Sequence, residues 1–488
     1  MARMMPISNN KRYMPTTTMP RQVVQGGIAL FIIALIAVSI SFLDHVLPFG
    51  LWMFGICSVV LFFLGSWEGT RKWERVSRKT FVKNLILTAL LIRVIFVIFI
   101  NYYNLAHFDT YWGAGSTDVT FYVPEAWGAA ERCMDGDWSF YTNWIDGGIA
   151  VDDTGYMVYL VLVYVITGMT SDVVIPLLLK AVWGALTCWL IYKVAARHFG
   201  EHVGRIAGVM AMVYPSFIWW CGSMMKETEM LFLMMVYVDE VDAALSESKL
   251  SVRKLAVALL WGTTLFFFRT ILGVVAFLAL FTALVFSSSR IVGWGKKMLY
   301  GILVLLFVGV AISDRLINTM SKITEKAQSG EEVTARNSVR ARENTFAQYA
   351  TATVMAPLIF TAPFPSLVYT SFNQEQSMQR SGGNYVKNIL SFFVILVAFI
   401  LLLSGEWRRH VFPASFLLGY LIVLIFSSFA HSGRFHLPAE LLEVIFAAYG
   451  ISLMRNPKYK RWFYYALMAE FVIIMGWNYI KLSGRGYL

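Results

Sequence analysis

Long apolar runs recur along this chain and set the strongest limit on how it can fold. Many of them approach the roughly 20 residues that an α-helix needs to cross a bilayer. Of all 488 residues, 58% are hydrophobic and 15% are charged, which is far more apolar than a soluble globular protein. Membrane-spanning strands are shorter and alternate apolar with polar positions, and these runs do not. We therefore expect an all-α polytopic membrane protein.

Basic and acidic residues between the runs predict the orientation of the chain. The loop 71–83 carries six lysines and arginines, whereas the interval 104–155 carries nine acidic residues and one basic residue, Arg132. Under the positive-inside rule the loop is cytoplasmic and the acidic interval faces outward. Most other basic clusters then also fall on the cytoplasmic side. The exception is a short basic tail with Lys481 and Arg485.

This alternation predicts about thirteen transmembrane helices, a cytoplasmic N-terminus and an outer C-terminus. The tyrosine-rich segment 155–168 is expected to lie along the outer interface instead of spanning. The net charge of +11 is then a topology signal, and we expect no nucleic-acid partner. The expected spans are 24–40, 51–64, 85–100, 176–196, 206–220, 229–241, 256–268, 272–286, 298–312, 389–403, 412–429, 437–454 and 462–480.

The compartment that follows is the plasma (inner) membrane, with a candidate site on its outer, periplasmic or extracellular, face. The four cysteines form no metal-binding or disulfide pattern, although Cys133 and Cys221 are both expected outside, which leaves a bridge between them open. Three prolines within 356–365, at apolar depth, predict a broken or re-entrant segment that must be buried in protein or line a cavity.

The first candidate site residues lie in the acidic interval. Asp118, Tyr122 and Glu125 follow a plausible helix cap at Ser116 or Thr117, and their spacing places them on one face of a short helix. A carboxylate at the membrane surface can act as a general base on an acceptor hydroxyl, or hold a divalent cation. The alternative is that Asp118 only caps a surface helix.

Charged residues at the outer ends of later apolar runs are the second group of candidates. Lys226 and Glu227 enter an apolar helix, Arg269 interrupts a phenylalanine-rich hairpin, and Arg434 follows His431 before another span. Charges at such depth are costly and need a partner or a function. A mutual Lys226–Glu227 ion pair, or headgroup contact by Arg269, are the alternative interpretations.

The order of these motifs resembles the beginning of integral-membrane glycosyltransferases of the GT-C fold, especially the protein mannosyltransferase and aminoarabinose transferase type. The resemblance covers about residues 84–290 well and the remainder loosely. Many relatives have two adjacent acids in the first motif, whereas Thr117 and Val119 flank Asp118 here. The residues that carry the resemblance are Asp118, Tyr122, Ala126, Gly136-Asp137-Trp138, Gly155-Tyr156, Gly168 and Phe199-Gly200.

The resemblance implies a GT-C-like helical bundle and a polyprenyl-phosphate sugar donor. Residues 1–290, with the outer loop 104–155, would form its transmembrane module, and 291–488 a variable module with an outer segment 313–387. No cofactor is certain, and a divalent cation, Mg²⁺ or Mn²⁺, stays open. The implied roles are catalysis by Asp118 and Glu227, donor-phosphate binding by Lys226, Arg269 and Arg434, and acceptor or sugar contacts from Tyr122, Glu125, Tyr156 and His431.

We therefore expect an inverting glycosyltransferase of cell-envelope glycan biosynthesis, with a lipid, glycan or protein acceptor. One alternative is a polysaccharide polymerase or ligase that uses undecaprenyl-pyrophosphate glycans, although such proteins lack the early Asp–Tyr motif. Another is a lipid or solute transporter, which needs ionisable residues at mid-membrane and repeat symmetry. In this sequence the charges gather at the outer face and no repeat is visible.

Overall fold

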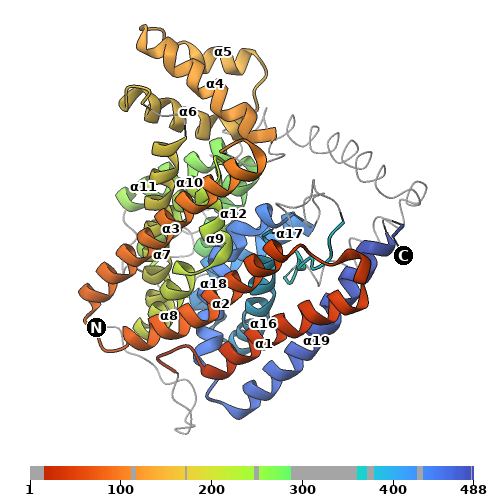
Figure 1. Ribbon diagram of the computed structural model, residues 1–488. Coiled ribbons are helices and arrows are strands. Elements are labelled where there is room, and N and C mark those ends of the chain that lie inside the picture. Colours follow the sequence, from red (N-terminus) through yellow and green to blue (C-terminus); the bar gives the residue numbers. More distant parts are fainter. Residues whose placement is uncertain are drawn as a thin grey trace, which may run out of the picture.

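A computed structural model describes residues 16–111, 117–170, 173–246, 252–286, 360–370, 379–425, 432–484 and 486–487. Across these ranges the protein is helical, and the only β-pairing among them is an isolated bridge between Val46 and Val368. The all-α prediction is therefore confirmed for the described part of the chain. The helices pack into one bundle, from one end of which three short helices project (Figure 1).

The projecting helices are α4 (Thr117–Met134), α5 (Phe140–Asp146) and α6 (Val151–Ile166). The other helices form the bundle. They are α1 (Arg21–Ser41), α2 (Phe49–Lys72), α3 (Arg78–Phe108), α7 (Val174–Phe199), α8 (Glu201–Met212), α9 (Pro215–Trp219), α10 (Glu227–Leu245), α11 (Val252–Phe268), α12 (Thr270–Phe286), α16 (Ser381–Ser404), α17 (Val411–Ile425), α18 (Gly433–Ser452) and α19 (Pro457–Ser483), with 3₁₀ turns at Leu43–His45, Trp220–Gly222 and Glu406–His410.

Seven helices among the described residues are long and apolar enough to cross a membrane. They are α1, α2, α3, α7, α16, α19 and the stretch Glu406–Ile425. The predicted count of about thirteen is not confirmed. The helices α11 and α12 have 17 residues each, α10 and α18 carry several charged residues, and 298–312 lies outside the described residues.

Loops that were predicted to share the cytoplasmic side meet at one end of the bundle. Arg205, at the start of α8, donates to the carbonyl oxygens of Trp73 (2.9 Å) and Glu74 (3.1 Å) in the α2–α3 turn. His198, at the end of α7, has its Nδ1 atom 3.0 Å from that of His410 in the α16–α17 turn. The acidic helices α4, α5 and α6 project from the other end (Figure 1). The α2–α3, α7–α8 and α16–α17 turns therefore lie at one end of the bundle, opposite the acidic helices.

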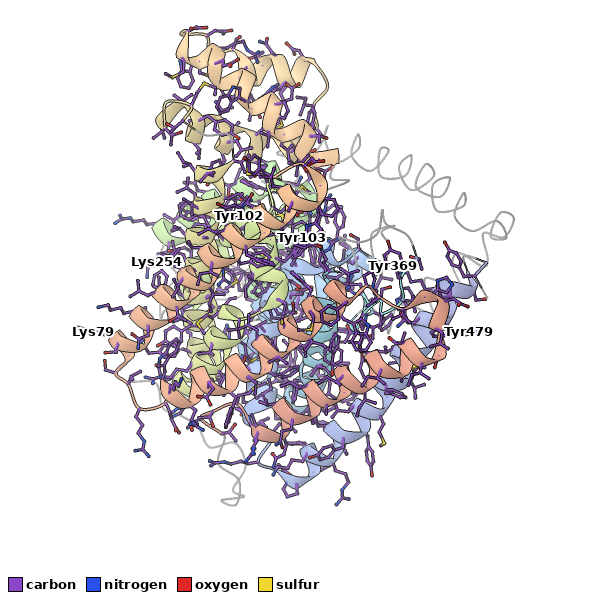
Figure 2. The ribbon with its side chains drawn as sticks, in the orientation of Figure 1. Lys79, Tyr102, Tyr103, Lys254, Tyr369 and Tyr479 are labelled. Atoms are coloured by element: carbon purple, nitrogen blue, oxygen red, sulfur yellow. The ribbon has the colours of Figure 1, made fainter. Side chains whose placement is uncertain are left out.

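Helix α3 runs between the two ends of the bundle and carries different residue types at each. Lys79 lies near its first turn, and Tyr102 and Tyr103 lie near its last turns, below the projecting helices (Figure 2). Tyr102 is 73% exposed. Tyrosines at one end of an apolar helix and lysines at the other are typical of residues at the two membrane–water interfaces.

The expected span 206–220 is wrong as a single helix. Helix α8 ends at Met212 and α9 begins at Pro215, because a residue before proline avoids the helical conformation and Tyr214 is extended. The carbonyl groups that this break leaves open accept hydrogen bonds from the fully buried Arg93 of α3, at 3.3 Å for Ala211 and 3.1 Å for Met212. The break lets the chain turn toward α10.

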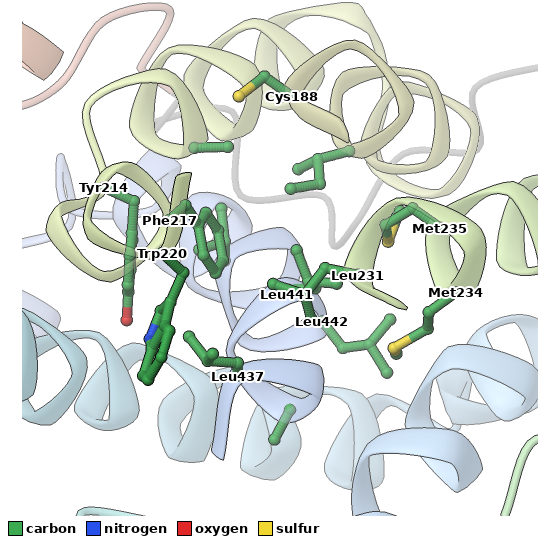
Figure 3. Close-up of a cluster of buried hydrophobic side chains, with 14 of the residues drawn as sticks. Cys188, Tyr214, Phe217, Trp220, Leu231, Met234, Met235, Leu437, Leu441 and Leu442 are labelled. Atoms are coloured by element: carbon green, nitrogen blue, oxygen red, sulfur yellow. The ribbon is translucent and has the colours of Figure 1, made fainter. Parts of the chain in front are cut away.

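The core lies where α7, α9, α10 and α18 meet. Figure 3 shows Phe217 and Trp220 beside Leu437 and Leu441, with Cys188 of α7 nearby. Because α18 also packs on α7 and α8, the helices of the two expected modules share this core across residue 290. All four cysteines are free, so the conceivable Cys133–Cys221 bridge is absent.

The proline-rich segment is not helical where the structure describes it, over 360–370. Leu367 and Val368 are fully buried. Asn478 of α19 accepts from the Leu367 amide (2.8 Å) and donates to the Pro365 carbonyl (3.3 Å), and Lys387 of α16 donates to the Phe360 carbonyl (3.0 Å). The prediction of an irregular segment buried in protein is confirmed for 360–365, while 356–359 lie outside the described residues.

Candidate active site

Helix ends bring the predicted charged residues to one place. Asp118 is the second residue of α4, Lys226 immediately precedes α10, and Glu227 is the first residue of α10. Arg269 stands between α11 and α12, and Arg434 is the second residue of α18. All these ends lie on the side of the bundle from which α4 projects, so residues up to 316 positions apart in sequence meet there.

Arg434 is the centre of this group. Its Nη1 atom lies 2.5 Å from Asp118 Oδ2, and its Nε atom lies 3.4 Å from Glu227 Oε1. The same Glu227 oxygen lies 3.5 Å from Arg269 Nη2. Glu227 is fully buried, and neither of its carboxylate oxygens has a hydrogen-bond partner of good geometry among the described residues. It is therefore held between two guanidinium groups by charge alone.

Aromatic side chains fix the two guanidinium groups. The Phe435 ring centroid lies 4.5 Å from the Arg269 guanidinium carbon and 5.1 Å from that of Arg434. Arg269 also donates to the Tyr420 hydroxyl (3.2 Å), which donates in turn to the Phe435 carbonyl (3.0 Å). Contact with a ring face stabilises a cation and limits its movement. The arginines are therefore positioned before any ligand arrives.

Asp153, at the start of α6, joins the group through Lys226 and Tyr122. Its Oδ1 atom accepts from Lys226 Nζ and from the Tyr122 hydroxyl, each at 2.5 Å. Burial acts to raise the pKa of Asp153, but the neighbouring Lys226 and the two hydrogen bonds outweigh it and hold that pKa below its usual value. Burial and the adjacent Asp153 raise the pKa of Tyr122, so its phenol keeps its proton.

A buried ion pair supports the turn that carries Lys226 and Glu227. Lys180 of α7 lies 2.6 Å from Glu229 of α10 and donates to the carbonyl oxygen of Met225, one residue before Lys226. Neither Lys180 nor Glu229 is more than 4% exposed at its side chain. Lys180 thus joins this turn to the first turn of α10, next to Lys226 and Glu227.

Arg380, just before α16, adds a further positive charge. Its guanidinium carbon lies 5.3 Å from the Trp220 ring centroid. Burial and the neighbouring Arg434 lower its pKa to about 10, with Glu227 opposing, so Arg380 remains protonated at neutral pH. We call the whole set the Arg434 cluster. It comprises four cations and three carboxylates among the described residues: Lys226, Arg269, Arg380, Arg434, Asp118, Asp153 and Glu227.

Three predicted site residues do not join this cluster. Glu125 is exposed on α4. Tyr156 is fully buried, with its ring centroid 5.5 Å from that of Tyr122 and 4.9 Å from Lys180 Nζ, so it supports the site from beneath. His431 lies outside the described residues.

Sequence reasoning missed three contributors as well. Asp153 was one of nine acids in its interval and carried no distinguishing signal. Arg380 lies before an apolar run, as Arg434 does, and this position could have identified it as a candidate site residue. Tyr420 lies inside an apolar run with no polar neighbour.

The cluster does not fit a divalent cation. The carboxylates of Asp118 and Asp153 already pair with Arg434 and Lys226, and Glu227 lies between two arginines. Among the described residues no group of three His, Cys, Asp or Glu side chains is arranged to hold a metal ion. The lysine and arginine side chains suit an anion instead, and we assign no step to Mg²⁺ or Mn²⁺.

Comparison of this chain with protein-family models and with curated protein sequences finds no match.

Proposed function

We propose that this protein is an integral-membrane glycosyltransferase that moves a sugar from a polyprenyl-phosphate donor to an acceptor hydroxyl at the outer face of the plasma membrane. One observation carries the proposal. Arg434 joins Asp118, a carboxylate suited to act as a base, to a group of cations suited to bind phosphate. Base and phosphate site are thus adjacent, as sugar transfer from a lipid phosphate requires. The GT-C-like motif order agrees with this arrangement.

The early Asp118–Tyr122 motif favours the transferase over the polymerase or ligase alternative, because such polymerases and ligases lack it.

In the proposed reaction the acceptor oxygen attacks the anomeric carbon while Asp118 takes the hydroxyl proton. The bond between that carbon and the donor phosphate oxygen breaks, and its electron pair leaves with the lipid phosphate. Arg434, Arg269 and Lys226 stabilise the departing anion. The Asp118–Arg434 ion pair opens when Arg434 binds the phosphate, which makes the carboxylate available. A single displacement inverts the anomeric configuration.

Mass-spectrometric profiling of lipid-linked sugars and surface glycans tests this function in cells that lack the protein. We expect a polyprenyl-phosphate sugar to accumulate and one modified acceptor to disappear, with both changes reversed by the wild-type gene. A change confined to glycan chain length would instead identify a polymerase. Unchanged donor and acceptor pools would reject the proposal.

A further inference from the structure

A second group of charged side chains lies inside the bundle, between α16 and α18. Glu440 and Glu443 project from α18 and Lys387 from α16, and these residues are 2%, 1% and 0% exposed. At 1.5 Å per helical residue, the two glutamates lie about 9 and 14 Å beyond Arg434 along α18. The expectation that the charges gather at the outer face is therefore wrong for these three residues. We call these three residues the Glu443 group.

Lys387 does not neutralise both glutamates. Its Nζ atom lies 3.9 Å from Glu443 Oε1, beyond hydrogen-bond distance, and it donates to the carbonyl oxygens of Phe360 and Ala362 in the irregular segment 360–370. The Lys387 ammonium group thus also binds the segment 360–370. One cation faces two carboxylates in this part of the described structure.

The carboxylate oxygens themselves indicate a missing positive partner. Both oxygens of Glu443 and Oε2 of Glu440 are buried with no hydrogen-bond partner among the described residues. Glu440 is hydrogen-bonded to Tyr214 and Ser216 at the α8–α9 break. These hydroxyl groups stabilise the ionised Glu440 carboxylate but do not neutralise its charge.

The neighbouring acid on α19 does not belong to this group. Glu470 accepts from Asn388 Nδ2 at 3.0 Å. An ionised carboxylate without a counter-charge costs several kcal/mol in a protein interior. With both carboxyl groups ionised, Lys387 therefore leaves one negative charge of the Glu443 group to be compensated.

We propose that Glu440 and Glu443 together bind one small cation, either a proton or Na⁺. A proton shared between two nearby carboxyl groups removes their mutual repulsion. Na⁺ is a hard cation, for which carboxylate and hydroxyl oxygens are suitable ligands, and those of Tyr214 and Ser216 stand beside Glu440. This cation site is separate from the Arg434 cluster.

The test uses the full-length protein in lipid nanodiscs, with the variants Glu440→Gln and Glu443→Gln and the exposed Glu125→Gln as control. Infrared spectra in H₂O and D₂O report the carbonyl stretch of a protonated, buried carboxyl group. Thermal unfolding in NaCl against choline chloride of equal ionic strength reports Na⁺ binding.

If the cation is a proton, we expect the wild-type carboxyl band to persist in Glu125→Gln and to be lost in at least one of the other variants. If it is Na⁺, we expect NaCl to raise the wild-type unfolding midpoint by on the order of 3 °C, with no effect on Glu443→Gln. The proposal is overturned if the wild type shows neither the carboxyl band nor stabilisation by NaCl, and this result does not require that any variant folds. It is also overturned if the signal of the wild type persists in both Glu440→Gln and Glu443→Gln.

Discussion

Two networks of charged side chains lie at opposite ends of α10. One network holds helices together, whereas the other is suited to bind a ligand. The Arg434 cluster surrounds Glu227 at the first residue of the helix. A second network, which we call the Asp242 cluster, lies twelve to fifteen residues further, or about 18 to 22 Å along the axis. Its members are Lys193, Arg197, His198, Asp239 and Asp242.

The Asp242 cluster is closely bonded. Asp239 lies 2.5 Å from Lys193 and 2.8 Å from Arg197, and Asp242 lies 2.5 Å from Arg197 and 2.9 Å from His198. Each carboxylate thus has two close partners. A network that satisfies its own charges holds α7 to α10 and leaves no need for a ligand.

In the Arg434 cluster the central carboxylate, Glu227, has only ionic contacts of 3.4 and 3.5 Å with Arg434 and Arg269. Guanidinium groups paired at this distance remain able to donate hydrogen bonds to an anion. The comparison therefore predicts that changes in the Arg434 cluster alter ligand binding and catalysis, whereas changes in supporting pairs alter stability.

The largest expected effect is that of Asp118→Asn, which removes the proposed base. Transfer by the purified protein should fall by roughly 10²- to 10⁴-fold, with an unchanged unfolding midpoint. Glu125→Gln, seven residues further along α4 and exposed, is the matched control and should transfer normally. Equal rates for the two variants would remove Asp118 from the mechanism.

Lys180→Met should have the largest effect on stability. Loss of the ammonium group leaves Glu229 buried without its partner, which costs about 3–5 kcal/mol. Thermal unfolding in nanodiscs measures this loss. The double variant Lys180→Met, Glu229→Leu should recover most of it, and a double variant as unstable as the single one would contradict the ion-pair explanation.

Arg434→Lys keeps the charge but loses the planar fork that contacts both Asp118 and Glu227. A charged hydrogen bond contributes about 1.5–3 kcal/mol, so kcat/KM should fall by roughly 10- to 100-fold. This change is measured by steady-state kinetics with the sugar donor that mass-spectrometric profiling identifies. Full activity in the lysine variant would show that charge alone suffices there.

A smaller, pH-dependent effect is expected for Asp153→Asn. Because the pKa of Asp153 is lowered in the folded protein, its ionised form stabilises the fold above its unfolded pKa of about 3.9. That contribution is lost as the pH falls through the folded value. At pH 7 the variant should be less stable by about 1 kcal/mol, and below about pH 4 the two unfolding curves should converge. A constant difference at all pH values would exclude this cause.

The sequence predicts the helices and several site residues because both depend on local signals. Apolar runs define the spans, and a charge at the end of a run, as at Glu227 and Arg434, stands out against its neighbours. The Asp118–Arg434 contact joins residues 316 positions apart, and no local pattern encodes such a contact. Both residues could be predicted as site residues from their chemistry, but their contact follows only from the fold.

The parts that sequence analysis missed depend on burial and on helix termination. Lys180 and Lys387 interrupt apolar runs, yet a single lysine there does not reveal whether a carboxylate faces it. The break at Tyr214–Pro215 was visible as a proline, but its consequence depends on Arg93, far away on α3, which satisfies the open carbonyl groups.

Binding of undecaprenyl phosphate, followed by native mass spectrometry of the protein in detergent, tests the central claim most directly. Arg434→Gln and Arg197→Gln remove the same charge from the two clusters at opposite ends of α10. We expect wild type and Arg197→Gln to retain one lipid phosphate with similar affinity, and Arg434→Gln to bind it at least about tenfold more weakly. Equal binding by all three proteins would show that the Arg434 cluster is a scaffold like the Asp242 cluster and not a phosphate site.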